Sequence, residues 1–160
     1  MPTRRASTRD LNRRDLLCTL AASTAAAALS ADAPTAAAEE AAAVSLQAFE
    51  KAKLQEFPWG WIRWLMNAEI DPKAEMTLGV VQVQENQSNP LHIHPNSAEY
   101  LHMLSGSCEH RLGSRWVLLK TGDTLRIPRG VPHMARTKGE GFRALIVYDT
   151  GTRKMVPVTE

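Results

Sequence analysis

The segments HIHPNSAEYLHMLSG (residues 92–106) and GDTLRIPRGVPH (residues 122–133) carry most of the information in this 160-residue chain. All 5 histidines of the sequence lie within or between these segments. Four residues have the spacing of a site made of three imidazoles and one carboxylate: His92, His94, Glu99 and His133. Because imidazole and carboxylate together suit a divalent first-row metal, the sequence points to a metal site.

The spacing of these residues is consistent with a site carried by β-strands. Residues two apart in a strand face the same side, so His92 and His94 point inward while Ile93 points away. A turn after His94 lets Glu99 begin the next strand on the same interior face. His133 comes from a distant hairpin, and a closed β-barrel brings such separated strands together around one point.

Both segments resemble the two motifs of the cupin superfamily. The first motif reads H-x-H, three or four residues, E, six residues and G, and is matched by His92, His94, Glu99 and Gly106. The second reads G, five residues, P-x-G, two residues and H, and is matched by Gly122, Pro128, Gly130 and His133. This resemblance spans roughly residues 76–148 and implies an all-β fold, a single jelly-roll (cupin) β-barrel. It also implies one divalent metal ion held by His92, His94, Glu99 and His133, without distinguishing Fe, Mn, Zn, Ni and Cu.

Two positions depart from the family pattern. Asn86 stands where the first motif usually has glycine, and asparagine is the non-glycine residue that best tolerates a positive φ. We therefore expect the turn to be kept. Thr137 stands where the second motif usually ends in asparagine. It should face inward with His133 and Ala135, because the three are spaced two residues apart along a strand.

Other polar residues near the motifs have less specific roles. His102 is at odd offset from Glu99 and should face outward. His110 shares parity with Cys108, and a role beside the metal ligands stays open for both. We expect the arginines to be mostly exposed to solvent. The alternative is that Arg126 or Arg136 reaches into the cavity and binds the carboxylate of a substrate.

The first 38 residues are typical of an export signal. Five arginines precede an apolar stretch from Leu16 to about Ala31, and small residues follow through Ala38. Residues 12–17 (NRRDLL) resemble a twin-arginine signal, which predicts a periplasmic or secreted protein. The alternatives are an organellar transit peptide or a disordered tail. The apolar stretch is too short and too rich in alanine for a stable membrane span.

The remaining 122 residues are electrically balanced, with 14 Lys plus Arg against 14 Asp plus Glu. Nucleic acid or an anionic membrane would need a concentrated basic face, so neither is expected as a partner. Cys108 is the one cysteine left after cleavage, which excludes an intramolecular disulfide and favours burial as a small apolar side chain.

We divide the rest of the chain into a 39–75 extension, a 76–150 barrel and a 151–160 tail. In the extension, residues 39–56 have helix-forming composition, and the tryptophan-rich residues 58–66 predict a strand used for core or interface packing. Seven short strands are predicted in the barrel, separated by turn residues: 76–84, 99–104, 108–112, 115–119, 124–127, 133–137 and 143–148.

The sequence favours an exported metal-dependent enzyme, an oxygenase or related lyase acting on a small, oxygen-rich molecule that chelates the metal. The alternative is a non-catalytic module that binds a metal or small ligand, so whether the chain is an enzyme stays open. A small molecule is the expected partner in both cases. The tryptophan-rich segment also allows a homodimer.

Overall fold

The computed structural model describes residues 46–159; the predicted signal peptide (1–38) and the start of the predicted extension lie outside this range. The described part carries one short 3-10 turn, η1 (Phe49–Lys51). Its strands are β1 (Lys53–Phe57), β2 (Gly60–Met66), β3 (Thr77–Val83), β4 (His92–Ile93), β5 (Glu99–Leu112), β6 (Arg115–Lys120), β7 (Thr124–Ile127), β8 (His133–Arg136), β9 (Phe142–Tyr148) and β10 (Val156–Pro157). Within these residues, no helix is long and apolar enough to cross a membrane.

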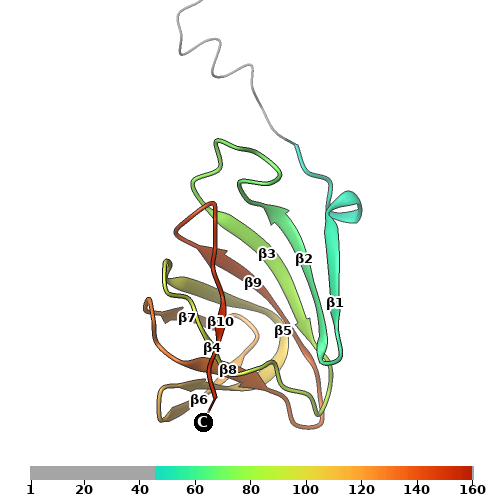
Figure 1. Cartoon of the computed structure of the whole chain (residues 1–160). Helices are drawn as coiled ribbons and strands as arrows, with labels where there is room; N and C mark the ends of the chain where they lie inside the picture. The colour runs from blue at the N-terminus through green and yellow to red at the C-terminus, as the bar shows by residue number, and fades with distance from the viewer. Residues whose placement is uncertain (1–45, 160) are drawn as a thin grey trace, which may run out of the picture. The chain divides into compact units, whose positions relative to one another are not determined.

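The strands form a curled antiparallel sheet (Figure 1). Its order is β1-β2-β3-β9-β5-β8-β4-β10, and β6 and β7 also pair with β5. Up to Gly106, β5 pairs with β7 and β9; from Ser107 onward it pairs with β6 and β8. Because one long strand passes from one half of the sheet to the other, the sheet folds back on itself and encloses an interior. The all-β, jelly-roll prediction is confirmed.

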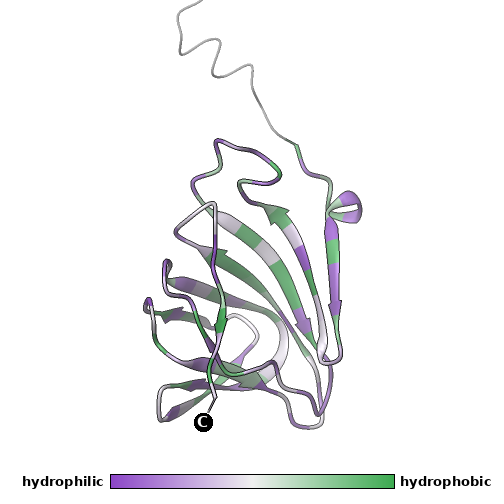
Figure 2. Ribbon diagram, viewed as in Figure 1, coloured by the Kyte–Doolittle hydropathy of each residue, from purple (hydrophilic) through white to green (hydrophobic). Residues whose placement is uncertain are grey.

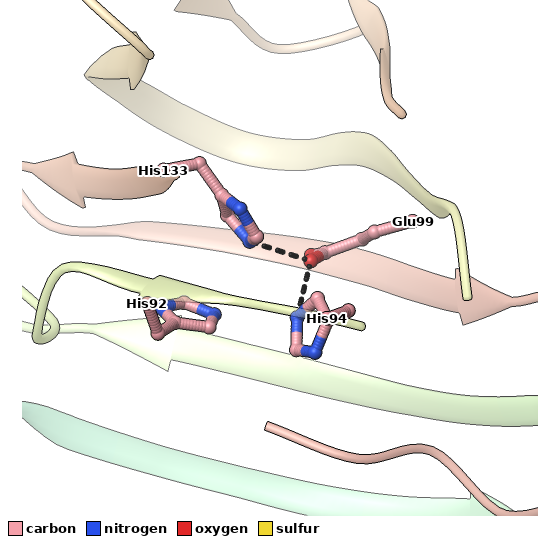
Figure 3. Close-up of side chains that lie close together, drawn as sticks. All are labelled: His92, His94, Glu99 and His133. Atoms are coloured by element: carbon pink, nitrogen blue, oxygen red, sulfur yellow. Dashed lines mark hydrogen bonds and ion pairs between the residues drawn. The ribbon is translucent and has the colours of Figure 1, made fainter. Parts of the chain in front are cut away.

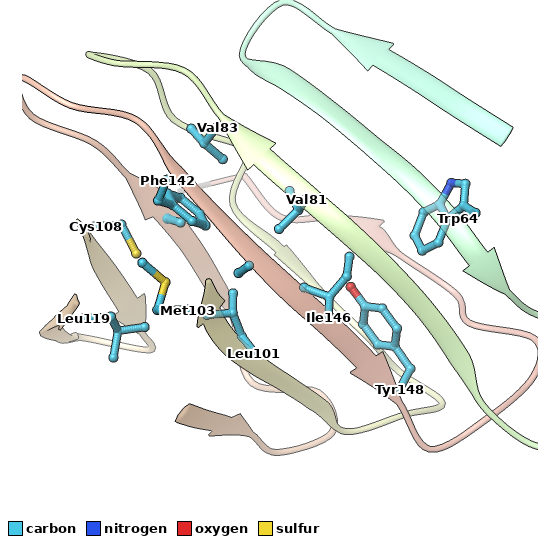
Figure 4. Packing of buried hydrophobic residues seen from close by; sticks show 12 residues of the cluster. Trp64, Val81, Val83, Leu101, Met103, Cys108, Leu119, Phe142, Ile146 and Tyr148 are labelled. Carbon is cyan, nitrogen blue, oxygen red and sulfur yellow. The ribbon is translucent and has the colours of Figure 1, made fainter. Parts of the chain in front are cut away.

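Alternating burial along the strands builds the core. In β5, Glu99, Leu101 and Met103 are buried while the residues between them are exposed. Figure 2 shows hydrophobic residues gathered along β3 and β9, and hydrophilic residues on β1 and in the turns. Figure 4 shows the side chains that these strands bury together, among them Val81, Phe142 and Ile146. Burying one such side chain contributes about 1.5–3 kcal/mol, so the two halves of the sheet are held by their shared interior.

The middle of β5 corrects one prediction. The two strands predicted at 99–104 and 108–112 are one continuous strand, with a register shift between Met103 and Ser105. Past the shift, the buried positions are Cys108 and His110, so the residues that point inward change from odd-numbered to even-numbered positions. Gly106 lies at this point with φ 75°, and a Cβ there would lie 2.1 Å from a backbone oxygen. The predicted turn is therefore a bulge that redirects the strand.

The loop after β3 depends on the two positions that depart from the family pattern. Asn86 has φ 56°, as predicted, and among the described residues it is the sole non-glycine with a positive φ. Its side-chain oxygen accepts a 3.0 Å hydrogen bond from the amide of Gly139. Thr137 is buried, as predicted, and its hydroxyl donates to the carbonyl of Gln84 at 2.6 Å and accepts from the amide of Gln87 at 3.0 Å. The threonine therefore fastens this loop.

The extension forms strands where composition predicted a helix. Among the described residues of the 39–56 segment, the helix is limited to η1, and residues 53–57 form β1, paired along their length with β2. Hydrogen bonds to a neighbouring strand outweigh a weak helical propensity. The tryptophan-rich strand is confirmed as β2, and Trp64 is buried in the core. Trp59 precedes β2 and stacks on Phe57 with ring centroids 4.5 Å apart.

The C-terminal segment is part of the barrel, which the prediction of a tail missed. β10 pairs with β4, placing Val156 opposite Ile93 and Pro157 opposite His92. The preceding residues are held by Asn96, whose amide donates to the carbonyl of Thr152 at 2.8 Å. Asn96 also accepts from the amide of Lys154 at 2.9 Å.

Candidate metal centre

Four side chains from three neighbouring strands converge inside the barrel (Figure 3). His92 lies in β4 directly opposite His133 of β8, His94 follows β4, and Glu99 begins β5. All four are buried. The structure therefore brings together the four residues that the sequence singled out.

The ligand atoms of these residues are close enough to share one ion. One atom from each residue lies within 4.8 Å of every other. A carboxylate oxygen of Glu99 is 3.1 Å from His94 Nε2 and 3.2 Å from His133 Nε2. Nitrogen and oxygen ligands about 2.1 Å from a common ion lie roughly 3.0–4.2 Å from one another, depending on the angle between them. The two Glu99 distances fall in this range, so the group can hold a single divalent metal ion after a small inward shift of its most distant atoms.

Backbone carbonyls orient all three imidazoles. A carbonyl oxygen can only accept, so the ring nitrogen that faces it carries the proton. The three Nδ1–H groups donate at 2.7–2.8 Å, His92 to Pro90, His94 to Lys154 and His133 to Val131. In the neutral ring, Nε2 then has a free lone pair. Such outer hydrogen bonds fix the tautomer and ring orientation of metal-binding histidines.

The electrostatics of the group call for a positive charge at its centre. Burial alone would raise the pKa of Glu99, but the ring nitrogens of His133 and His94, 3.1–3.2 Å away, outweigh it and hold that pKa well below its ordinary value. Burial lowers the pKa of His92 to about 4, and His133 adds to the effect. A carboxylate and neutral imidazole lone pairs about 3 Å apart repel unless a proton or a cation lies between them. The donor set therefore fits a metal cation.

Two further buried residues border the four. His110 lies parallel to His133, with ring centroids 5.9 Å apart and planes 15° apart, and burial lowers its pKa to about 4. The Tyr148 ring packs edge-on against His94 at 4.9 Å. Burial, with the nearby Glu99 carboxylate, raises the pKa of Tyr148 well above its ordinary value. Near neutral pH both side chains are therefore uncharged, and Glu99 supplies the negative charge beside the histidines.

A cavity of about 150 Å³ opens beside the four residues. Its polar lining includes His92, Glu99, His110, His133, Tyr148 and Arg153. Its apolar lining includes Phe57, Trp59, Ile62, Val81, Val83, Leu101, Phe142 and Ile146. Apolar side chains thus form most of the wall.

The remaining predicted residues are placed as follows. His102 is exposed, as predicted, and its ring bonds to the Thr124 hydroxyl at 2.9 Å. Cys108 is buried as predicted, and burial raises its pKa to about 12.

The arginines Arg126 and Arg136 lie outside the cavity, so the alternative that one of them reaches into it is wrong. Arg126 is exposed on β7 beside the Tyr100 hydroxyl, and Arg136 forms an ion pair with Glu109 at 2.6 Å. Arg153 lines the cavity instead. Sequence reasoning missed it because no local pattern shows that the C-terminal segment pairs with β4.

The match to a family model and the similar solved structures agree with this architecture. Residues 79–148 match the Cupin domain family. No curated protein matches the sequence. The oxalate decarboxylase of Lactobacillus farciminis, in its formate complex, is 21% identical with a TM-score of 0.63 over 68% of this chain and 34% of that one. The polyketide cyclase RemF from Streptomyces resistomycificus is 24% identical with a TM-score of 0.62, over 73% of this chain and 87% of that one.

A third similar structure concerns the Mn(II) centres of Bacillus subtilis oxalate decarboxylase. It is 18% identical, with a TM-score of 0.63, over 69% of this chain and 31% of that one. The chain spans about a third of the length of the oxalate decarboxylases that it matches. At these identities the likeness establishes the fold, and the chemistry has to be argued from the site.

Proposed function

We propose that this chain, which carries a cupin domain at residues 79–148, is a metal-dependent enzyme, an oxygenase or related lyase, acting on a small chelating molecule. The observation that carries the proposal is the convergence of three oriented imidazole lone pairs and one buried carboxylate on a single point beside a cavity. In this proposal His92, His94, Glu99 and His133 are the metal ligands.

The chain's own residues prepare the site in three ways. Backbone carbonyls hold the imidazoles with Nε2 facing inward, so little reorganisation accompanies metal binding. Glu99 supplies a negative charge that partly neutralises a dication and leaves a net positive centre for an anionic oxygen ligand. The apolar wall keeps water from the reacting groups. A divalent first-row ion held there acts as a Lewis acid toward oxygen ligands.

The cavity limits the substrate. A volume of about 150 Å³ admits a small molecule, and the largely apolar wall favours an apolar or unsaturated body. The metal-binding residues His92, Glu99 and His133 in the wall favour a ligand with oxygen atoms. The oxalate decarboxylases and the polyketide cyclase support an enzyme, since both activities occur on this fold.

A non-catalytic binding module is the second candidate. His110 and Tyr148 border the cavity beside the four ligands, and their pKa values lie far from neutral pH. Neither is poised to exchange protons readily at pH 7. A site that captures a ligand without turnover would have this character.

Metal content and oxygen uptake separate these candidates. We expect about one equivalent of a first-row metal in the purified protein, and oxygen consumption or product formation with one member of a panel of catechols, enediols and dicarboxylates. Tight ligand retention without turnover would favour the binding module. His133→Ala should lose the metal, while His102→Ala should keep it, because His102 is exposed on the outer face of β5. Equal metal content in both variants would contradict the ligand assignment.

We also propose that the protein is exported by the twin-arginine route. The support is the NRRDLL segment at residues 12–17, ahead of an alanine-rich apolar stretch. Replacing both Arg13 and Arg14 by lysine should leave the precursor inside the cell. Secretion of the double variant at the normal level would contradict this route.

A further inference from the structure

Arg153 occupies a junction between two hollows of the protein. It lines the buried cavity beside the four converging residues and also an outer groove of about 640 Å³. Gln55 of β1 lines both as well. A ligand that enters the cavity from the groove would pass these two side chains.

The Arg153 side chain is held by aromatic rings. Its guanidinium carbon lies 4.8 Å from the centroid of the Trp64 ring and 5.1 Å from that of Tyr148. Tyr148 in turn packs on His94. Contacts with aromatic rings position a guanidinium while leaving the N–H donors in its own plane free for other partners. The arginine is thus placed near the proposed metal ligands by two cation–π contacts.

The backbone around Arg153 is fixed to the same site. Thr152 and Lys154, its two neighbours, both bond to the Asn96 side chain. The Lys154 carbonyl also accepts from His94 Nδ1 at 2.7 Å. A group anchored on both sides loses little freedom when it binds a ligand.

The charge of Arg153 has no carboxylate partner within residues 46–159. The half-buried guanidinium makes no ion pair there, whereas Arg136 is paired with Glu109. The acidic residue of the outer groove, Glu69, pairs with Lys53 at 3.5 Å. Glu99 is the carboxylate of the inner cavity, and it faces His94 and His133. A half-buried cation without an anion, at the edge of an apolar cavity, fits an anionic ligand.

We propose that Arg153 binds a carboxylate group of the ligand, so that the cavity selects small carboxylates with an apolar body. This inference rests on the proposed function for the position of the ligand's other end, at the four converging residues. Arg153 is then a specificity-determining residue. The guanidinium would donate two parallel hydrogen bonds to the carboxylate.

Calorimetric titration of the purified full chain tests this inference with charged and neutral probes of equal shape. The pairs are benzoate with benzamide and, for a smaller body, acetate with acetamide. The wild-type protein should bind the carboxylate of at least one pair about tenfold or more tightly than the amide. Arg153→Gln should lose this preference, and Arg153→Lys should keep part of it because the charge remains. Arg126→Gln is the matched control, since Arg126 also lies near a tyrosine ring, at 5.9 Å, but outside the cavity.

The outcomes separate this inference from the proposed function. Metal content is measured on every variant, and Arg153→Gln should retain the wild-type amount. A preference that survives in Arg153→Gln, or a wild-type protein that binds both members of each pair equally or not at all, overturns the carboxylate site. A wild-type protein that contains no metal, yet prefers carboxylates through Arg153, supports this site and contradicts the metal-dependent function. Thermal unfolding of each variant shows that it is folded.

Discussion

Acidification of the metal-free protein should destabilise it through two buried histidines. Burial lowers the pKa values of His92 and His110 from 6.5 to about 4 in the folded chain. The unfolded chain therefore takes up these protons first as the pH falls. Their stabilising contribution is complete above about pH 6.5 and decreases continuously toward pH 4.

The size of the effect follows from these pKa values. Each pH unit in this window costs about 1.4 kcal/mol per histidine, so between pH 7 and pH 5 each removes about 2 kcal/mol from the free energy of unfolding. The two together remove about 4 kcal/mol, a large part of the roughly 5–15 kcal/mol of a small domain. Protonation of Glu99 also lowers the free energy of unfolding, but only below the pKa of Glu99 in the unfolded chain, near 4.5. The loss of stability above pH 5 therefore comes from the two histidines.

Urea unfolding of chelator-treated protein, followed by tryptophan fluorescence at several pH values, measures this loss. His110→Gln should show about half the dependence on pH between 7 and 5, because one of the two groups is gone. His102→Gln should keep the wild-type dependence, since that residue is exposed. A free energy of unfolding that stays constant over this range, or a His110→Gln variant with the full dependence, would refute the reasoning.

The remaining predictions concern the metal and two turns. Metal binding should raise the thermal unfolding midpoint of the wild-type protein, because the ion binds the folded chain. This increase should vanish in His133→Ala, and an equal increase in that variant would argue against the site. Asn86→Gly should change the free energy of unfolding by less than about 1 kcal/mol, whereas Asn86→Val should lower it by about 2 kcal/mol or more, because valine does not tolerate a φ of 56°. Equal effects would show that the positive φ is unimportant. Gly106→Ala should lower the free energy of unfolding more than Gly113→Ala, although both glycines have a positive φ. A Cβ at Gly106 would lie 2.1 Å from a backbone oxygen, whereas a Cβ at Gly113 would have nothing within 4 Å. The reverse order would contradict the bulge at Gly106.

The sequence predicted what local chemistry determines. The period of two along a strand placed His92 and His94 on one face, and the backbone tolerance of asparagine explained the turn at Asn86. Outward orientation of His102 followed from the same parity. These features depend on a few consecutive residues, so they could be read without coordinates.

The features that were missed depend on pairings between distant segments. Residues 53–57 are a strand because β2 lies beside them, and their composition contains no sign of that partner. The orientation of His110, which the sequence left open, depends on a bulge in β5. Arg153 reaches the cavity because β10 pairs with β4, while Arg136, the alternative considered for that role, is paired with Glu109. Long-range strand pairing is not encoded in the local pattern, which explains these errors.

Anomalous X-ray diffraction from crystals of the protein, purified without added metal or chelator, tests the central claim most directly. We expect one strong peak within about 2.0–2.2 Å of His92 Nε2, His94 Nε2, His133 Nε2 and a carboxylate oxygen of Glu99. Crystals with no peak between these four side chains, or with the metal bound elsewhere, would contradict the account.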